Sequence, residues 1–441
     1  MKSASPQATR WLILAHCFNM DGRAASQTIT DRLPAILQAG VRPVVLSAPT
    51  GDRDARFPHF QVISPAPSGV LFELRHIIKK KAPSRFAEKV LKTLLLLACL
   101  PFLVVEKLLV QLDSQWSWFI SATVRGLLVG RAYRPDMIYS TAGPPSTHVA
   151  GYLLHKLLRR PWLAEIHDPL IYDDERPRWH NYRFKKWIEK IVLANAAAVI
   201  YFTDKALESA SRRHPVKGRA LVLRPGADLP DLKGAAYVRR DRLHLGHFGS
   251  LAADRNLAAV IKGLHAIFQD RPELRARICL DIYGARPDPV TETALGQFPL
   301  GDAVCLHGRL EFDSQTGKSG RQQVLEAMRR SDILLLVHGT DSTCGEYIPS
   351  KLYEYLLMRR PILGLAAHGS ELETILTATG HTAVNQDDPE AVQAVLRALI
   401  QTWFVSGLPD SDFESPFTVD QAVGRLLEVA RAITPASGQP F

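Results

Sequence analysis

The residues whose types and spacing best suit chemistry are Lys351 and Glu354, in the run Pro-Ser-Lys-Leu-Tyr-Glu-Tyr-Leu that begins at Pro349. Proline is typical of the first turn of a helix, where its missing N–H costs nothing. Lys351 and Glu354 are three residues apart and would share one face of that helix. A ligand beyond the helix start would meet N–H groups and an ammonium, which suit a phosphate, and a carboxylate, which suits sugar hydroxyls. The combination predicts a sugar-nucleotide site.

An apolar run and a polar loop must position this helix. Residues 333–337 are typical of a buried strand, and a loop of Gly, Thr, Asp, Ser and Cys follows them. Leu352, Tyr355 and Leu356 recur at helical spacing and predict one buried stripe. Taken alone, the pattern also fits a surface helix with a Lys/Glu ion pair, because such pairs are common at this spacing. The rest of the chain must decide between the two interpretations.

Length and charge narrow the class of protein. A chain of 441 residues exceeds a single core, so we expect two domains. Hydrophobic residues at 46% and charged residues at 22% are typical of a globular protein. The net charge of +10 and a pI near 9.4 predict an anionic partner: nucleic acid, anionic lipid or a phosphorylated substrate. Because no helix-turn-helix, RNA-recognition or zinc-finger signature is present, we do not expect nucleic acid.

The cysteines indicate the compartment. They stand at positions 17, 99, 279, 305 and 344, with no C-x-x-C pair. Such scattered cysteines suit a reducing cytosol better than a disulfide framework or a zinc site. The apolar run 11–15 is too short for a signal peptide and predicts a first buried strand instead. We therefore expect a cytoplasmic protein.

The first half of the chain has the rhythm of a doubly wound sheet. A strand (11–15), a loop, a helix (26–39) and a second strand (41–46) form a βαβ opening. Ligands of such sheets bind beyond the carboxyl ends of the strands, which places Gly22 in a candidate binding loop. An ordinary β–α turn is the alternative for this loop.

A second strand end carries acid–base groups. Residues 160–166 read as a strand that ends in His167-Asp168-Pro169. At this position the Asp168 carboxylate could hold a reacting sugar or orient an acceptor hydroxyl, and His167 could contact a donor sugar. Asp-Pro is also a common way to start a turn, which is the structural alternative.

The segment from about residue 72 to 130 departs from the α/β rhythm. A basic cluster opens it and an almost uniformly apolar run, 94–105, follows. This run is shorter than the ~20 residues that span a bilayer. Basic and apolar residues together favour a segment that lies in the interface of an anionic membrane; a buried helix with a solvated basic flank is the alternative. Trp116 and Trp118 could be interfacial anchors or core residues. The basic cluster comprises Arg75, Lys79, Lys80, Lys81, Arg85, Lys89 and Lys92.

The second half opens with another phosphate-type turn. A strand ends at Phe248, Gly249 and Ser250 follow, and Arg255 precedes a helix that covers 257–270. A strand that runs into a Gly-containing turn and then a helix is typical of phosphate loops. Arg255 could equally be a solvated loop residue.

Several motifs carry a resemblance to a known family. Glu346 and Glu354 form Glu-x7-Glu, and the run from Pro349 leads into Arg-Arg-Pro-Ile-Leu, which resembles the donor-binding helix of retaining GT-B glycosyltransferases of family GT4, the bacterial polysaccharide type. Pro-Asp-Met-Ile-Tyr-Ser-Thr, from Pro135, and Asp-Pro, from Asp168, resemble the acceptor-side domain of the same group. Gly-Ala-Asp from Gly226 resembles the motif that closes this domain. The resemblance covers roughly residues 10–430.

The resemblance implies an α/β GT-B fold: two facing Rossmann-like domains with the active site in the interdomain cleft. The acceptor-side domain would be 1–228, followed by a linker, 229–242. The donor-binding domain would be 243–415, and 416–441 would form a C-terminal helix that crosses back, with a tail.

The resemblance also assigns donor-binding roles. Glu354 would hold the ribose hydroxyls, and Lys351 and Arg255 the diphosphate. Gly249 and Ser250 would form the phosphate turn, although Ser250 stands where the family has a cation. At least one of Lys351 and Arg255 must then stabilise the leaving diphosphate.

The reaction itself is likewise implied by the resemblance. Glu346 would face the donor sugar, and Asp168 or His167 the reacting centre. The enzyme would move a sugar from a nucleotide diphosphate sugar to an acceptor hydroxyl, with retention and an oxocarbenium-like transition state. No cofactor or metal is expected, because the two Asp-x-Asp runs fall in a polar stretch, 52–54, and in the tail, 410–412.

The expected partners follow from the basic–apolar segment. It suggests a glycan or lipid-linked acceptor and a location at the inner face of the cell membrane. A rival interpretation is an inactive sugar-nucleotide-binding scaffold or regulator, which Ser250 and the glycine-poor loop around Gly22 keep open. Two further alternatives are a basic nucleic-acid-binding protein and a sugar-nucleotide epimerase of the same fold.

Overall fold

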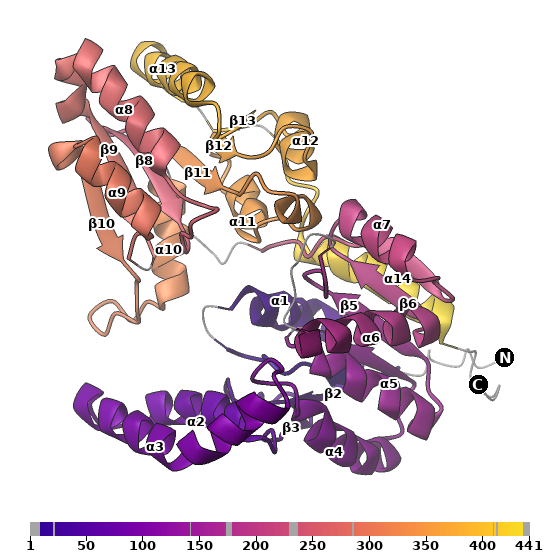
Figure 1. Cartoon of the computed structure of the whole chain (residues 1–441). Coiled ribbons are helices and arrows are strands. Elements are labelled where there is room, and N and C mark those ends of the chain that lie inside the picture. Colours follow the sequence, from indigo (N-terminus) through magenta and orange to yellow (C-terminus); the bar gives the residue numbers. More distant parts are fainter. Residues whose placement is uncertain are drawn as a thin grey trace. The chain divides into compact units, whose positions relative to one another are not determined.

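The computed structural model describes residues 9–20, 23–141, 143–172, 179–228, 237–284, 286–408, 410–411 and 413–434. The chain divides into two compact units (Figure 1). Unit 1 comprises Met1–Gly226 and Val419–Phe441, and unit 2 comprises Ala227–Thr418. The domain bounds inferred from the sequence, at 228, 243 and 416, stay a prediction beside these units.

Unit 1 contains a parallel sheet in the order β3-β2-β1-β4-β5-β6-β7. This is the doubly wound order, in which the direction of winding reverses between β1 and β4. Its strands are β1 (Arg10–Leu14), β2 (Arg42–Ser47), β3 (His59–Gln61), β4 (Met137–Ser140), β5 (Trp162–Ile166), β6 (Ala198–Tyr201) and β7 (Arg219–Val222). Its helices are α1 (Ala24–Gln38), α2 (Pro67–Lys81), α3 (Arg85–Leu109), α4 (Trp118–Tyr133), α5 (Ser146–Leu158), α6 (Trp179–Asn195), α7 (Asp204–Arg213) and α14 (Val419–Ile433).

Unit 2 repeats the plan with the order β10-β9-β8-β11-β12-β13, also parallel. Its strands are β8 (Leu243–Phe248), β9 (Ile278–Tyr283), β10 (Val304–Gly308), β11 (Ile333–Val337), β12 (Ile362–Leu365) and β13 (Thr382–Val384). Its helices are α8 (Ala258–Asp270), α9 (Pro289–Gln297), α10 (Gly320–Arg330), α11 (Lys351–Leu357), α12 (Glu371–Ala378) and α13 (Pro389–Val405), with short 3-10 turns η1 (Pro272–Arg277), η2 (Gly301–Ala303) and η3 (Thr343–Glu346).

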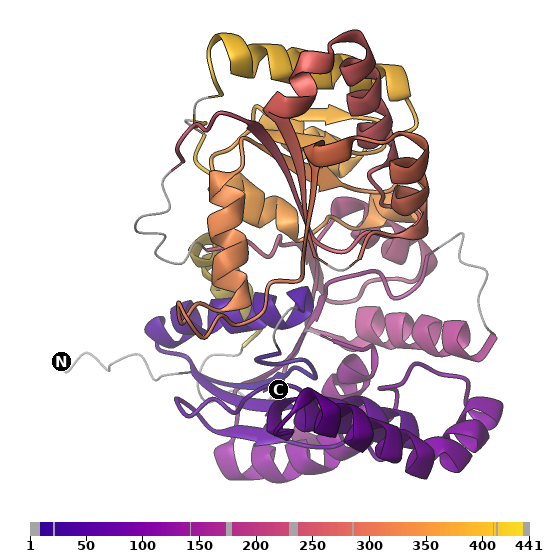
Figure 2. The ribbon, with the colours of Figure 1, turned by 90° about the vertical axis from the view of Figure 1, so that its left-hand side faces the viewer.

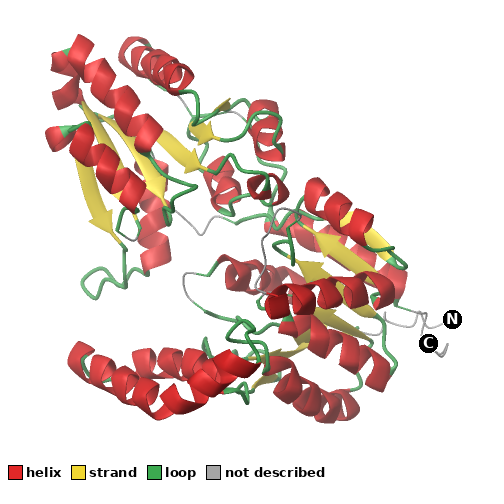
Figure 3. Cartoon of the chain, viewed as in Figure 1, coloured by secondary structure: helices red, strands yellow, loops and turns green. Residues whose placement is uncertain are grey.

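Helices cover both faces of each sheet, which is why the strands are apolar throughout (Figures 2 and 3). In unit 1 one face packs on α4, α5 and α6, and the other on α1 and α14. In unit 2 one face packs on α8 and α13, and the other on α10, α11 and α12. The α/β class and the two Rossmann-like sheets expected from the sequence are confirmed.

The segment that broke the α/β rhythm forms a helical hairpin, α2–α3, that belongs to unit 1. The apolar run 94–105 lies inside α3, a helix of 25 residues in which none is buried. The alternative of a buried helix is therefore wrong. Trp118, in contrast, is fully buried and packs in the core. Among the described residues we find no helix long and apolar enough to cross a bilayer.

Some expectations fall on residues outside the described ranges. These are Gly22, residues 229–236 of the linker, Asp412, and the tails 1–8 and 435–441. Asp410, which the sequence places in a tail, is instead held in unit 2: Arg360 Nη1 donates to its carboxylate at 2.8 Å and Arg329 Nη1 at 2.9 Å. The expectation of a tail at Asp410 is wrong, because Arg360 is fully buried and Asp410 supplies its counter-charge.

Candidate functional site

In doubly wound sheets, ligands bind where the winding reverses, beyond the carboxyl ends of the strands. In unit 2 this point lies between β8 and β11. The loop after β8 carries Gly249, Ser250 and Arg255, and the segment after β11 carries Glu346 and leads to α11. The topology thus brings the donor-binding residues predicted from the sequence to one edge of the unit 2 sheet.

The turn after β8 depends on close backbone packing. Gly249 adopts a φ of +147° and its N–H donates to Tyr283 O at 2.9 Å. Gly284, at the end of the neighbouring strand, has a φ of +143°, and a Cβ there would lie 2.1 Å from Gly249 O. Only glycine fits at position 284, and this contact fixes the path of the turn. Ser250 is exposed.

Arg255 closes the turn through its backbone. Ala252 and Arg255 exchange two backbone hydrogen bonds of 2.9 Å. The Arg255 side chain is about one-third exposed and its Nε lies 3.6 Å from Asp254 Oδ2. Asp254, Asp341 and Cys344 each bring a ligand-type atom within 4.8 Å of the others, but both aspartates are exposed. The turn therefore presents one arginine next to acidic side chains.

Helix α11 holds Lys351 and Glu354, which the sequence predicts to bind the donor. Leu352, Tyr355 and Leu356 are buried, as predicted. Glu354 is also buried, and Lys351 Nζ donates to its Oε2 at 2.5 Å. Arg321 on α10 lies 3.6 Å from the other carboxylate oxygen. Glu354 is thus a buried carboxylate between two cations rather than a solvated partner in a surface pair.

A histidine that the sequence analysis overlooked shapes the loop that carries Glu346. His338 is buried at the end of β11, and its Nε2 donates to Cys344 O at 2.7 Å and to Tyr347 O at 3.1 Å. Burial lowers the pKa of His338, and Arg255 adds to the effect. The neutral imidazole fastens η3, and with it the buried Glu346. A histidine directly after an apolar strand was the signal available in the sequence.

In unit 1 the winding reverses between β1 and β4, and His167 lies at the end of the next strand, β5. Its ring stacks on Phe202 at 4.4 Å, and its Nε2 donates to Glu165 Oε1 at 2.9 Å. Thr141 Oγ1 donates to the same oxygen at 2.8 Å. The buried Glu165 carboxylate therefore holds the His167 ring in one orientation. The spacing of the residues in the sequence does not reveal this positioning role of Glu165.

Glu165 is charged although it is fully buried. Burial opposes the charged form, but Arg32 Nη1, 2.5 Å from Glu165 Oε2, and His167 hold the pKa of this carboxyl well below its usual range. Arg32, from α1, also donates to Pro225 O at the end of the domain. A glutamate inside an apolar strand requires such a partner, so the sequence did contain a sign of this pair.

Asp168 is exposed and borders two pockets of unit 1. The larger, of about 410 Å³, extends from Asp168 and the Gly143–Pro145 turn to Lys107 and Gln111 at the end of the α2–α3 hairpin. The smaller, of about 190 Å³, is lined by Glu165, His167, Asp168 and Lys185. The predicted reacting residues and the hairpin end thus border connected surfaces of one unit. In unit 2 a pocket of about 630 Å³ beside α8 and α9 holds none of the predicted residues.

Buried polar contacts fasten the hairpin to the loop after β1. Glu73 on α2 accepts from Ser64 N at 2.8 Å and from His16 Nε2 at 3.2 Å. Burial alone would lower the pKa of His16, but its contacts with Cys17 and Glu73 raise it. Within the hairpin, Glu106 near the end of α3 accepts from Ser68 N, at the start of α2, at 2.8 Å and so joins the two helices. The hairpin is therefore a fixed part of unit 1.

Comparisons with known proteins agree with this architecture. Residues 38–226 match the family model of the glycosyl transferase 4-like domain. No curated protein matches the chain. Among solved structures, HepE from Anabaena in complex with UDP and glucose has a TM-score of 0.57 and 13% identity over 96% of this chain and 100% of that chain.

Two further structures are similar. Sucrose-phosphate synthase from Thermosynechococcus elongatus has a TM-score of 0.57 and 13% identity, covering 97% of this chain and 96% of that chain. The lipopolysaccharide outer core galactosyltransferase WaaB has a TM-score of 0.57 and 10% identity, covering 96% of this chain and 99% of that chain. The matched domain in unit 1 and the fold shared with these structures support the resemblance to GT-B glycosyltransferases of the GT4 type that was drawn from the sequence.

Proposed function

We propose that this protein is a retaining glycosyltransferase that moves a sugar from a nucleotide diphosphate sugar to the hydroxyl of a lipid-linked glycan at the inner face of the cell membrane. The observation that carries the proposal is the pocket of about 410 Å³ that joins Asp168 to the end of the α2–α3 hairpin. A glycan bound there could present its hydroxyl to Asp168 while its lipid followed the hairpin.

Unit 2 would bind the donor. Glu354 would accept hydrogen bonds from the ribose, and Lys351 would then turn from Glu354 to the diphosphate. Arg255 would be the second cation at the leaving group, where charge builds in the transition state. Transfer would need no divalent metal, because these cations take over charge stabilisation. HepE was crystallised with UDP and glucose, which supports a UDP-sugar as the first donor to try.

The hairpin would bind the membrane. Its tip carries Arg75, Lys79, Lys80, Lys81, Arg85 and Lys89, all exposed. Along α3 the exposed apolar side chains include Leu94, Leu97 and Phe102, at 57%, 58% and 64%. Each leucine that leaves water for the interface contributes about 1.5–3 kcal/mol when fully buried, so a few are sufficient for binding. The basic tip adds attraction to anionic lipid.

A second candidate function is an inactive donor-binding scaffold. The observation that favours it is Ser250, which is exposed in the turn after β8 where the resemblance places a cation for the leaving diphosphate. A scaffold would bind the sugar nucleotide and transfer nothing. A transfer assay therefore distinguishes the scaffold, which forms no product, from the enzyme.

The experiment is a transfer assay with the full chain, UDP-glucose and other sugar nucleotides, and a polyprenyl-diphosphate glycan in anionic vesicles, without added divalent metal. We expect a glycosylated lipid whose new bond keeps the anomeric configuration, and a loss of at least 100-fold in rate for Asp168→Asn. Asp204→Asn, an exposed substitution on α7, is the control. Donor binding without any transfer would favour the scaffold, and full activity of Asp168→Asn would overturn the role of Asp168.

A further inference from the structure

Five side chains able to bind a soft metal gather on one face of the unit 2 sheet. In the parallel register His244 pairs with Cys279, and Cys305 pairs with Asp281. Because alternate residues of a strand share a face, His307 joins the same set. We call these residues the β8–β10 cluster: His244, Cys279, Asp281, Cys305 and His307. None of them belongs to the proposed donor site, so the inference below goes beyond the proposed function.

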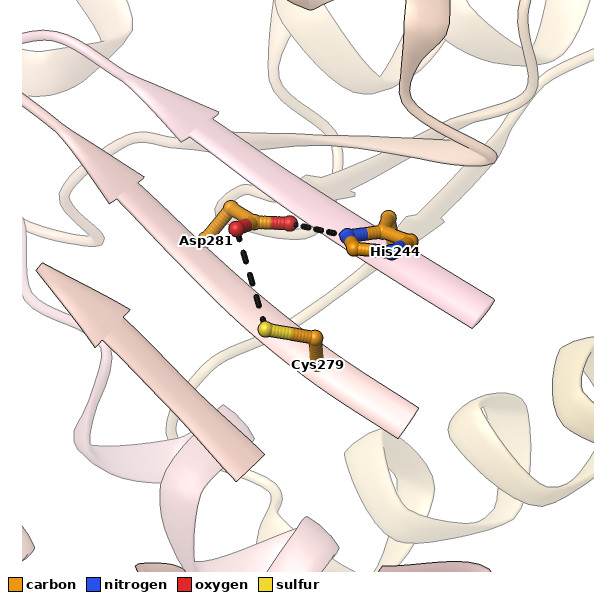
Figure 4. A group of neighbouring side chains, drawn as sticks. All are labelled: His244, Cys279 and Asp281. Atoms are coloured by element: carbon orange, nitrogen blue, oxygen red, sulfur yellow. Dashed lines mark hydrogen bonds and ion pairs between the residues drawn. The ribbon is translucent and has the colours of Figure 1, made fainter. Parts of the chain in front are cut away.

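The contacts within the β8–β10 cluster are short. Asp281 lies between two imidazoles, with its Oδ2 2.6 Å from His244 Nδ1 and its Oδ1 2.7 Å from His307 Nε2 (Figure 4 draws His244, Cys279 and Asp281). Cys279 Sγ lies 3.7 Å from Asp281 Oδ1 and 3.1 Å from Cys305 Sγ. His244, Cys279 and Asp281 place ligand atoms within 4.8 Å of one another.

The chemical types of the ligating atoms narrow the choice of metal ion. Thiolates and imidazoles select zinc among the common cellular divalent ions, whereas magnesium and calcium require oxygen ligands. A carboxylate that binds zinc is usually held by a further hydrogen bond, and His307 supplies that bond to Asp281. Burial, with Cys305 and Asp281, raises the pKa of the Cys279 thiol, and Arg242 opposes this rise only in part.

We propose that the β8–β10 cluster is a structural zinc site in which His244 Nδ1, Cys279 Sγ, Asp281 Oδ2 and Cys305 Sγ bind the ion and His307 orients Asp281. Two sulfur atoms on a tetrahedral zinc, each at ~2.3 Å, lie about 3.8 Å apart. The Sγ atoms of Cys279 and Cys305 therefore need to separate by less than about 1 Å. Cys305 lies outside the group of three whose ligand atoms are all within 4.8 Å of one another, so its side chain must also rotate toward them when the ion binds. Four protein ligands leave no open position, so the zinc takes no part in transfer.

Zinc binding must balance its protons. Each thiol releases one proton to solvent, and His244 keeps one proton, on Nε2, while Nδ1 binds the ion. Solvent reaches the site at His307 on the edge strand β10, where the side chain is 34% exposed, and at His244 on β8, where the side chain is 17% exposed. Occupation would stabilise unit 2 because β8, β9 and β10 would be joined through side chains as well as through their backbone ladder.

Metal analysis of the full chain, purified without a metal-binding tag, tests the site. After incubation with zinc and removal of excess, we expect about one zinc per chain and release of about two protons on binding. Cobalt in place of zinc should give thiolate-to-metal charge-transfer absorption. Cys279→Ser and Asp281→Asn should each lower zinc affinity by 10-fold or more, and Cys99→Ser, on α3, should leave it unchanged.

Two results would overturn the proposal. One is a chain that retains no zinc and shows no cobalt–thiolate band, which would leave the cluster as a hydrogen-bonded network. The other is a count of three thiols in unreduced, denatured protein in place of five. That count, restored to five by reductant and absent in Cys305→Ser, would mean that Cys279 and Cys305 form a disulfide. The conservative Asp281→Asn variant, which keeps both cysteines, separates a loss of zinc from a loss of folding.

Discussion

At the scale of single residues, the predicted site residues His167 and Glu354 are held by charged partners. His167 relies on Glu165, which relies on Arg32; Glu354 relies on Lys351 and Arg321. Spacing in the sequence identified the outer member of each set, because a strand end or a helix face can be inferred from periodicity. Arg32 and Arg321 come from distant segments, so neither spacing nor composition could pair them with Glu165 and Glu354.

Buried histidines make the stability of the protein depend on pH. Burial, with some repulsion from His167, lowers the pKa of His148 from 6.5 to about 3. Below pH 6.5 the unfolded chain therefore binds a proton that the folded chain does not. The stability that this histidine contributes is complete above that pH and is lost as the pH falls toward 3. At pH 5 the loss is about 2 kcal/mol.

Urea unfolding at about pH 7.5 and about pH 5 measures this effect, since it reports the free energy of unfolding at each pH. We expect His148→Gln to lose about 2 kcal/mol less than the wild type between the two conditions. His180→Gln, an exposed substitution, should behave as the wild type. An identical loss in wild type and His148→Gln would contradict the assignment.

At the scale of elements, the turn after β8 depends on the absence of one side chain. A methyl group at Gly284 would meet Gly249 O at 2.1 Å in a backbone conformation that L-residues rarely adopt. We expect Gly284→Ala to lower the free energy of unfolding by about 2 kcal/mol or more and to weaken donor binding. Gly296→Ala is the matched control, because nothing lies within 4 Å of its Cβ in α9. Urea unfolding measures the free energy of unfolding of both variants. Equal values would show that the turn accommodates a side chain at position 284, which would contradict the prediction.

The α2–α3 hairpin is the element that we propose to contact the membrane. Leu97→Glu and Phe102→Glu place charges on exposed positions of α3, so folding should be unchanged while sedimentation with anionic vesicles falls at least 10-fold. Val405→Glu, at an exposed apolar position of α13, should bind vesicles as the wild type does. Vesicle binding that survives both α3 substitutions would exclude this face as the contact. Higher salt should weaken binding through the basic tip.

The sequence predicted the elements more completely than their surroundings. Apolar runs predicted β1, β2, β5, β8 and β11, because parallel strands are apolar on both faces, whereas the short strands β3 and β13 were not predicted. The run 94–105 illustrates the limit: apolarity predicts burial in core or membrane alike, and only the fold reveals that no residue of α3 is buried.

At the scale of the whole molecule, two doubly wound units repeat one plan, and in each the predicted residues lie near the edge where the winding reverses. That rule could be applied from the sequence alone, and the candidate residues that it predicted in each unit stay predictions. The cysteines show a kind of contact that this rule could not predict. Cys279 and Cys305 are 26 residues apart in the chain, yet neighbouring parallel strands bring their sulfur atoms to 3.1 Å. Contacts between strands of this kind depend on register, which the chain spacing does not encode.

The central claim is that unit 2 binds a sugar nucleotide through Glu354 and Lys351. The most direct test is the thermal unfolding of the full chain with a panel of UDP-, GDP- and ADP-sugars, in wild type and in Glu354→Ala. A ligand at 100 times its dissociation constant stabilises the folded state by about 2.7 kcal/mol, which is a measurable rise in Tm. The account predicts such a rise with at least one member of the panel and its loss in Glu354→Ala. No rise with any of these donors in a folded wild-type protein would contradict it.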